Sequence, residues 1–473
     1  MFFSRVIRAR LSRGIPRAHA SHPYSTKVPS SNFRRNIALF GFISSPGLWW
    51  LTTTRDDVPR FEGTPTSQLN LPPGPSKDEV TRIVSEGAYS HKVDNVSGVD
   101  RYYGTQLASN SPCEDKFLHG KLPSPRNDGS QWMTWAVFDG HAGSQTADLL
   151  EKQLMPFLAH SLGQMKSLPS NDSVAEESIH DAITKGFMDL DKAIIDDAAE
   201  LTRSKIPLHE KVKLLAPAYA GSCALLSLYD PVSSKLHVAC TGDSRAVLGQ
   251  KGPDGKWEAI PLSIDQTGYN MGEVERLQKE HPGEEEMIKN GRVLGLAVSR
   301  AFGDSRWKWS LEFQKEMKQN FNGPSPLTPR YDVRTPPYLT AEPVITSTKI
   351  DPSRPSFLIM ASDGLWDMLS NQQAVDLVGK WLEPSEKRVE LEPTYEPFDF
   401  GQFWKGMNWK FMEERTTVQD ENAAVHLVRN SLGGNHHELI AGRLAFGAPF
   451  SRHIRDDITV QVAFFNVPDI QSR

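Results

Sequence analysis

Short apolar segments that begin or end on acidic residues recur along this chain of 473 residues, and they constrain its fold more than any other feature. Runs such as TWAVF and FLIMAS are typical of buried strands. The acids that adjoin such runs are Glu114 and Asp115, Asp139, Asp243, Asp363 and Asp367, and Asp456 and Asp457. One Asp-Gly pair is usually only a turn, but a whole set of acids at strand ends favours a shared site.

Carboxylates at the ends of neighbouring strands converge, and converging carboxylates repel one another. Like charges within about 4–6 Å either raise a pKa or require a cation between them. Carboxylate oxygens select hard ions such as Mg²⁺ and Mn²⁺, whereas zinc prefers nitrogen and sulfur ligands. Gly140, directly after Asp139, would let a backbone carbonyl approach an ion without a Cβ in the way. The sequence therefore predicts a divalent metal site.

The remaining pattern predicts an α+β fold. Strand-like runs occur in adjacent groups rather than in strict alternation with helices, which favours largely antiparallel sheets. Helical periodicity covers residues 144–158, 179–198, 272–280 and 372–382. Residues 307–337 and 383–421 fit neither pattern and are predicted to be insertions. Because we find no internal repeat and no second long linker, residues 86–468 are predicted to form one domain.

The first 85 residues differ from the rest of the chain. Residues 1–30 are rich in Arg and contain Ser, and the first acidic residue is Asp56. This composition is typical of a mitochondrial transit peptide, and a disordered basic tail is the alternative. Residues 36–54 contain an apolar run shorter than the roughly 20 residues of a membrane span; it is either a candidate inner-membrane anchor or part of the leader. Residues 55–85 are predicted to be a linker.

Composition narrows the classes of function. The net charge of −5 does not indicate a nucleic-acid-binding protein, because nucleic acid binds to basic surfaces. The three cysteines have no disulfide or zinc spacing and fit a reducing intracellular compartment. A cysteine-dependent phosphatase is excluded as well, because Cys240 and Arg245 lack the spacing of its phosphate-binding loop and Asp243 between them would repel phosphate.

Together and in this order, the motifs resemble those of the metal-dependent type 2C protein serine/threonine phosphatases. They are ED at 114–115, DGHAG at 139–143, TGDSR at 241–245, SRAFGD at 299–304, SDGLWD at 362–367 and RDDITV at 455–460. The stretches 106–117, 274–285 and 300–310 resemble one branch of that family, the mitochondrial pyruvate dehydrogenase phosphatases and their fungal relatives. The predicted leader agrees with that branch.

This resemblance implies a central antiparallel β-sandwich flanked by helices in four αββα layers, with two Mg²⁺ or Mn²⁺ ions at one end. The ligands it implies are Asp139, Asp363, Asp456 and the Gly140 carbonyl, with water-mediated contacts from Glu114 and Asp115 and a weaker third ion at Asp243 and Asp363. The expected reaction is attack on phosphoserine or phosphothreonine by a hydroxide that bridges the two ions. His141 is expected to protonate the leaving oxygen, because the pKa of histidine lies near working pH. Asp139 and His141 are therefore the predicted catalytic residues.

Two positions depart from the family pattern. Many members carry an arginine that grips the substrate phosphate at the position that Asn110 occupies here. Phosphate contact is therefore expected from the ions, at Asn110 itself, or from another cation such as Arg300. Asp457 replaces a more usual asparagine and would add negative charge beside Asp456.

Resemblance to the branch makes the phosphorylated E1α subunit of pyruvate dehydrogenase the expected substrate, in the mitochondrial matrix or at the inner membrane and intermembrane space. Two alternatives stay open. The same chemistry could act on another mitochondrial phosphoprotein, or the chain could be a catalytically inactive scaffold with a phosphatase fold. Inactive relatives usually lose metal ligands, and this sequence keeps every acid named above.

Overall fold

The computed structural model describes residues 75–126, 128–165, 172–404 and 409–467. They belong to one compact unit that begins at residue 74. The predicted transit peptide (1–30) and the apolar segment 36–54 lie outside the described residues. Among the residues that are described, no helix combines the length and the apolar character needed to cross a membrane.

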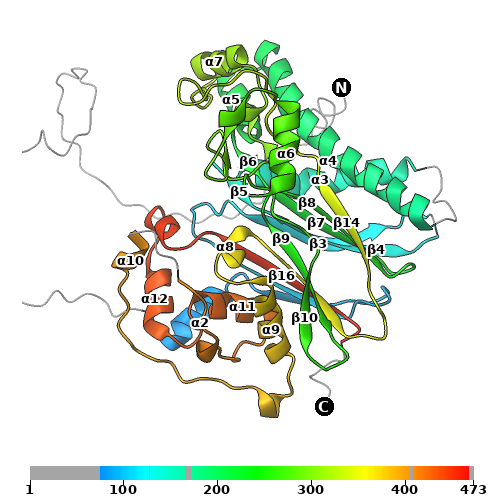
Figure 1. The fold of residues 1–473 in the computed structure, drawn as a ribbon, viewed down its shortest axis with the longest axis vertical. Helices are drawn as coiled ribbons and strands as arrows, with labels where there is room; N and C mark the ends of the chain where they lie inside the picture. The colour runs from blue at the N-terminus through cyan, green and yellow to red at the C-terminus, as the bar shows by residue number, and fades with distance from the viewer. Residues whose placement is uncertain (1–74, 127, 166–171, 405–408, 468–473) are drawn as a thin grey trace, which may run out of the picture. The chain divides into compact units, whose positions relative to one another are not determined.

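Two antiparallel sheets form the centre of this unit (Figure 1). The first has six strands in the order β1-β2-β16-β15-β9-β10: Tyr89–Lys92, Arg101–Leu107, Ile458–Phe465, Ser356–Ala361, Arg245–Lys251 and Trp257–Pro261. The second has five strands in the order β14-β8-β7-β4-β3: Val344–Lys349, Lys235–Thr241, Ala224–Asp230, Gln131–Phe138 and Lys116–Pro123. Side chains from both sheets, among them Trp135, Leu248 and Met360, meet in one apolar cluster, so the sheets form a sandwich.

Helices cover both outer faces of the sandwich (Figure 1). On one face α3 (Gln145–Gly163) contacts β3 and β4, and α4 (Asp172–Arg203) and α5 (Leu208–Tyr219) pack beside it. On the other face α2 (Lys77–Ser85), α9 (Asn371–Trp381), α11 (Ala423–Leu432) and α12 (His437–Ala445) share an apolar cluster with the first sheet. The predicted α+β sandwich with flanking helices is confirmed. The four segments of helical periodicity correspond to α3, α4, α6 (Met271–Glu280) and α9.

The folded domain begins earlier than the sequence predicts. Residues 77–85, assigned above to the linker, form α2. The Ser76 hydroxyl accepts a hydrogen bond from the backbone N–H of Glu79 and caps this helix. Val80 and Val84 are buried against the first sheet. The linker prediction was wrong at this end: Ser76 and the spacing of Val80 and Val84 mark a capped amphipathic helix, but this short segment follows directly on a Pro- and Gly-rich stretch.

Both predicted insertions pack onto the domain. In 307–337, α7 (Leu311–Asn320) follows η3 (Ser305–Trp307), and Trp307 and Leu327 pack with Leu277 of α6. In 383–421, Phe403 of α10 (Gly401–Trp404) packs with Leu439 and Ile454. The remaining short elements are η2 (Glu285–Met287), β11 (Ile288–Lys289), β12 (Arg292–Val293), η4 (Ser385–Lys387), η5 (Glu413–Arg415) and η6 (Phe450–His453).

Strand register brings the strand ends that carry acids together. In the first sheet Ala361, the last residue of β15, pairs with Val460 near the start of β16 and with Arg245 at the start of β9. In the second sheet Phe138, the last residue of β4, pairs with Lys116 at the start of β3. The acidic motifs lie just beyond these paired ends, at Asp363, Asp456, Asp243, Asp139 and Asp115.

Candidate metal centre

Three aspartates from different loops meet at the edge of the sandwich. Asp139 follows β4, Asp243 lies between β8 and β9, and Asp363 is the first residue of α8 (Asp363–Trp366). One carboxylate oxygen of each lies within 4.8 Å of those of the other two. The backbone N–H of Asp363 also donates to Oδ2 of Asp139 at 3.4 Å. The sequence predicts that acids at strand ends converge, and these three carboxylates do so in the structure.

Burial raises the pKa of all three carboxylates, and like charge adds to the rise at Asp139 and Asp243. Burial, then the charges of Asp363, Asp115 and Asp243, raise the pKa of Asp139 well above its usual value. Burial and then Asp363 raise the pKa of Asp243 to about 7, and burial raises that of Asp363. A divalent cation would remove this repulsion, and an all-oxygen donor set fits Mg²⁺ or Mn²⁺. The residues present thus fit the ions that the sequence predicts.

Gly140 is needed for its segment to pass close to the neighbouring loop. It forms β5 (Gly140–His141), which pairs with β6 (Gly221–Ser222). A Cβ at Gly140 would lie 2.3 Å from the carbonyl oxygen of Glu114, closer than atoms can approach. Any side chain here would therefore separate Asp139 from the 114–115 loop. That the Gly140 carbonyl ligates an ion stays a prediction.

Glu114 and Asp115 lie beside the three aspartates and are held by hydrogen bonds. Asp115 is 1 % exposed, and its Oδ2 accepts from the Thr459 hydroxyl at 2.8 Å. Burial and then Asp457 raise the pKa of Asp115 to about 7. Glu114 accepts from the backbone N–H of Gly143 at 2.6 Å. Both positions suit the predicted water-mediated contacts, which remain a prediction.

Asp456 does not join the group of three. Its carboxylate forms an ion pair with Arg452, four residues earlier in η6. The sequence predicts Asp139, Asp363 and Asp456 as the main ligands and Asp243 as a weaker one, whereas the structure brings Asp243 into the cluster and pairs Asp456 with a cation. Ligation by Asp456 therefore stays a prediction that requires this ion pair to open.

Asn110 and Asp457 organise the loop that carries Glu114. Oδ1 of Asp457 accepts from the backbone N–H of Ser109 and of Asn110 at 2.5 and 2.8 Å, and Oδ2 accepts from that of Glu114 at 2.8 Å. Burial alone would raise the pKa of Asp457, but these hydrogen bonds lower it. The side-chain amide of Asn110 donates to Glu114 and Asp457 at 3.0 and 3.2 Å. The amide of Asn110 thus binds two carboxylates, and its predicted contact with phosphate stays a prediction.

Arg300 is also engaged inside the protein. Its Nε and Nη2 donate to Glu273 at 2.7–3.0 Å, its Nη1 donates to the carbonyl of Glu342, and the residue is 8 % exposed. The predicted phosphate contact of Arg300 stays a prediction, and it would require these bonds to open. Arg245 pairs with Asp265 at 2.5–2.9 Å and with Asn371 at 2.7 Å. Sequence reasoning missed these partners because they lie on other elements.

His141 lies at the edge of the cluster and contacts Asp304. Its Nε2 is 2.6 Å from Oδ2 of Asp304. Burial would lower the pKa of His141, but the charge and hydrogen bond of Asp304 outweigh it, and Asp243 and Glu114 add to the rise. The pKa of His141 therefore lies above its usual value. An imidazolium held next to a carboxylate cluster is suited to donate a proton.

Asp304 and Gly221 are site residues to which the sequence analysis assigned no role. The strand β6 pairs with β5 on one side and with β13 (Phe302–Gly303) on the other, which brings Asp304 to His141. A Cβ at Gly221 would lie 2.1 Å from Nε2 of His141 and 2.2 Å from Oδ2 of Asp304. The motif SRAFGD marked Asp304, but only a three-strand pairing reveals its partner.

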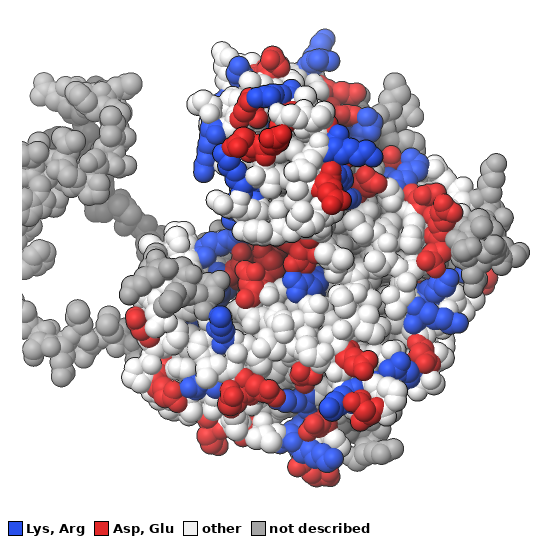
Figure 2. Space-filling model, viewed as in Figure 1, with Lys and Arg blue, Asp and Glu red and all other residues white. Residues whose placement is uncertain are grey.

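A cleft of about 620 Å³ opens beside the cluster and is lined by Asp243, Asp363, Arg245 and Tyr269. Figure 2 shows acidic side chains gathered in a hollow near the centre of the viewed face. Tyr269 is largely exposed at this cleft. A segment of another protein can therefore reach the carboxylates from solvent.

Comparisons with known proteins agree with this geometry. The family model described as protein phosphatase 2C matches residues 105–392. A protein phosphatase 2C homolog of Schizosaccharomyces pombe is 39 % identical over 94 % of this chain and 98 % of its own. Mitochondrial pyruvate dehydrogenase (acetyl-transferring)-phosphatase 1 of Saccharomyces cerevisiae is 37 % identical, over 80 % of this chain and 70 % of the relative. The protein of that name from Homo sapiens is 30 % identical, over 93 % and 91 %.

Proposed function

Since the chain belongs to the protein phosphatase 2C family and is a metal-dependent protein serine/threonine phosphatase, we propose that it acts in mitochondria on the phosphorylated E1α subunit of pyruvate dehydrogenase. The observation that carries this proposal is similarity along most of the chain to two relatives that are named mitochondrial pyruvate dehydrogenase phosphatases. The Arg-rich, acid-poor residues 1–30 support the same compartment.

The chain's own residues have distinct roles in the proposed reaction. Asp139 and Asp363, with Asp243 or Asp456, hold the divalent cations. Bound Mg²⁺ or Mn²⁺ would lower the pKa of a water molecule and offset the charge of the phosphoryl group. Asp304 keeps His141 protonated through its contact at Nε2, and the imidazolium donates a proton to the serine or threonine oxygen as it leaves.

Purified protein tests the substrate directly. We expect release of phosphate from phosphorylated E1α in the presence of Mn²⁺ or Mg²⁺, and its loss when a chelator is added. A phosphopeptide of unrelated sequence is the matched substrate control and should react more slowly. Equal rates on both would contradict E1α as the preferred substrate, while leaving the phosphatase assignment intact.

The same chemistry on another mitochondrial phosphoprotein is the second candidate. The fission-yeast relative, whose name states only the family, is compatible with either substrate. Phosphoproteomics of mitochondria that lack this protein separates the two. A rise in phospho-E1α supports the first proposal, whereas a rise confined to other proteins would replace it. The inactive-scaffold alternative is disfavoured by the three convergent carboxylates.

A further inference from the structure

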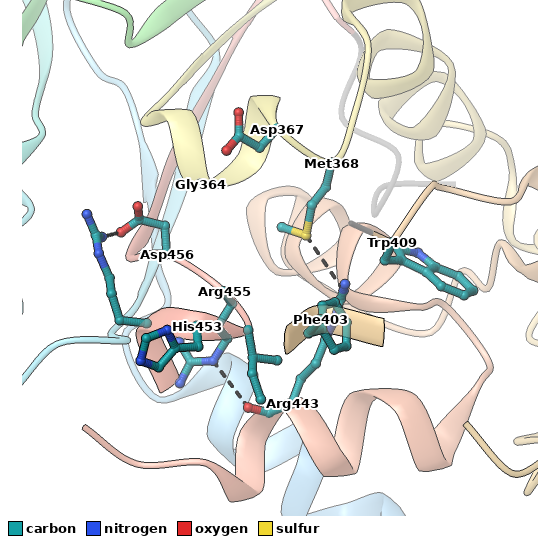
Figure 3. A pocket seen from close by; sticks show the side chains of 11 residues that line it. Gly364, Asp367, Met368, Phe403, Trp409, Arg443, His453, Arg455 and Asp456 are labelled. Atoms are coloured by element: carbon teal, nitrogen blue, oxygen red, sulfur yellow. Dashed lines mark hydrogen bonds and ion pairs between the residues drawn. The ribbon is translucent and has the colours of Figure 1, made fainter. Parts of the chain in front are cut away.

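A second, smaller pocket adjoins the candidate metal centre on the side of Asp456 (Figure 3). Its volume is about 160 Å³, and Gly364 and Asp456 form the wall nearest to Asp363. It differs from the large cleft, which lies on the side of Asp243, and the two share Asp367. The proposed function uses the large cleft and the carboxylates but leaves this pocket without a role.

The pocket is rich in positive charge. Three arginines and a histidine line it, namely Arg443, Arg452, Arg455 and His453, against the two carboxylates of Asp367 and Asp456. Arg452 is paired with Asp456. The two carboxylates therefore do not balance the three guanidinium groups, and ligation of an ion by Asp456 would leave the pocket more positive still.

Arg443 carries a buried charge without a matching acid. It is 1 % exposed, and its Nη1 donates to the carbonyls of Leu432 and Ser431 at 2.9 and 3.4 Å and to the sulfur of Met368 at 3.7 Å. Its Nε has no hydrogen-bond partner. Within the described part of the chain, its hydrogen bonds go to carbonyl oxygens and a sulfur, and it forms no ion pair with a carboxylate.

The surroundings of Arg443 explain why this charge matters. Its guanidinium lies 5.2 Å from the ring centre of Phe403, and a neighbouring guanidinium, that of Arg455, is anchored by the carbonyls of Ala108 and Arg443 at 2.7 and 3.4 Å. Burial and then Arg455 lower the pKa of Arg443 to about 9. A buried cation without a counter-ion is costly, and an anion with two oxygens would repay that cost through paired N–H donors.

We propose that this pocket is a substrate subsite that receives an acidic side chain adjacent to the phosphorylated residue. The inference rests on the proposed phosphatase function, because the pocket has this meaning only if the phosphoryl group lies at the neighbouring carboxylates. Its volume suits one side chain rather than a folded element, and successive residues of an extended peptide lie about 3.3–3.6 Å apart. A residue next to the phosphoserine can therefore reach past Asp456 toward Arg443. The recognised group is a carboxylate or a second phosphate.

Paired phosphopeptides test this subsite. Each pair differs only by Glu or Gln at one position, and the substitution is scanned along both sides of the phosphoserine. We expect the kcat/KM of the Glu peptide to exceed that of its Gln partner about tenfold at one position, a difference of about 1.4 kcal/mol. In Arg443→Met, which keeps the volume and removes the charge, this preference should fall below about twofold. Arg334→Met removes an exposed arginine that pairs with Asp332, lies outside the pocket, and should keep the preference.

The outcomes separate this inference from the proposed function. Phosphopeptide hydrolysis with no preference at any position in the wild-type protein would overturn the subsite but keep the phosphatase. Absence of metal-dependent hydrolysis would overturn the phosphatase itself. A preference that Arg443→Met retains would also overturn the subsite, provided that circular dichroism confirms the folded variant. Product inhibition by inorganic phosphate that weakens in Arg443→Met, without a peptide preference, would assign the pocket to released phosphate and overturn the proposal.

Discussion

Two buried groups of charges in this protein have opposite compositions. Asp420 and Arg429, each 3 % exposed, are joined by contacts of 2.8–3.0 Å between carboxylate and guanidinium. The cluster of Asp139, Asp243 and Asp363 contains carboxylates alone. The first group is complete within the chain and fastens α11 to its neighbours, whereas the second becomes neutral only when cations arrive from outside. Charge that is paired internally supports the fold, and charge that lacks its partner supports binding.

The sharpest test of this contrast is Asp139→Asn. It removes a charge that ions require, so turnover should fall by more than about 10⁴-fold, because the strong lowering of the pKa of a metal-bound water is lost with the ions. The metal-free variant should be at least as stable as the wild type, since repulsion is relieved. Steady-state kinetics and thermal unfolding measure both effects. Normal turnover would contradict the assigned site.

Asp420→Asn should have the opposite result. It leaves the buried Arg429 without its partner, so the free energy of unfolding should fall by about 3–5 kcal/mol. The kcat of the protein that remains folded should not change, because Asp420 lies on the helix layer away from the cluster. Urea unfolding, followed by assays at low denaturant, measures the two quantities. A stable variant with lost activity would reverse the comparison.

Binding of Mn²⁺ at the cluster of Asp139, Asp243 and Asp363 should stabilise the folded protein. At about 100 times its Kd, Mn²⁺ should raise the free energy of unfolding by about 2.7 kcal/mol. Asp420→Asn should gain as much from Mn²⁺ as the wild type, and Asp139→Asn should gain little. Thermal unfolding with Mn²⁺ or with chelator gives these values. An equal gain in Asp139→Asn would place the ions elsewhere.

Asp304→Asn should have the smallest effect. Asp304 raises the pKa of His141, so its loss lowers that pKa. His141 then loses its proton at a lower pH than in the wild type. The fall of kcat on the alkaline side of the pH profile should therefore begin at a lower pH. At neutral pH we expect about a tenfold decrease, smaller than the roughly 10²–10⁴-fold loss typical of removing a general acid, because His141 itself is retained. His141→Ala is the matched control and should lose this limb entirely. A pH profile of Asp304→Asn that coincides with the wild type would exclude Asp304 as a positioning residue.

The sequence predicted the features that follow from local patterns, namely the strands and the acids at their ends. Apolar runs and the acids at their ends predicted an α+β fold with antiparallel sheets and a meeting of carboxylates, and the resemblance of the motifs implied the sandwich. Strand register brings those strand ends together. The sequence did not predict the partners of Arg300 or His141. Those partners, Glu273 and Asp304, come from other elements, and a pairing across the fold leaves no periodic signal along the chain.

The sequence also did not predict where the folded domain begins or that Asp456 pairs with an arginine. α2 was assigned to the linker because only Val80 and Val84 mark its buried side. Asp456 was grouped with the ligands by its motif, and the ion pair with Arg452 depends on η6 bringing that arginine back toward it. Motifs identify which residues are special, whereas their contacts follow from tertiary packing.

Anomalous diffraction from crystals grown with Mn²⁺ tests directly whether Asp139 and Asp363 bind the catalytic ion. We expect at least one manganese peak within bonding distance of both Asp139 and Asp363, and none in crystals of Asp139→Asn. If the protein hydrolyses phosphoserine while all its manganese peaks lie away from Asp139 and Asp363, these residues do not hold the catalytic ion.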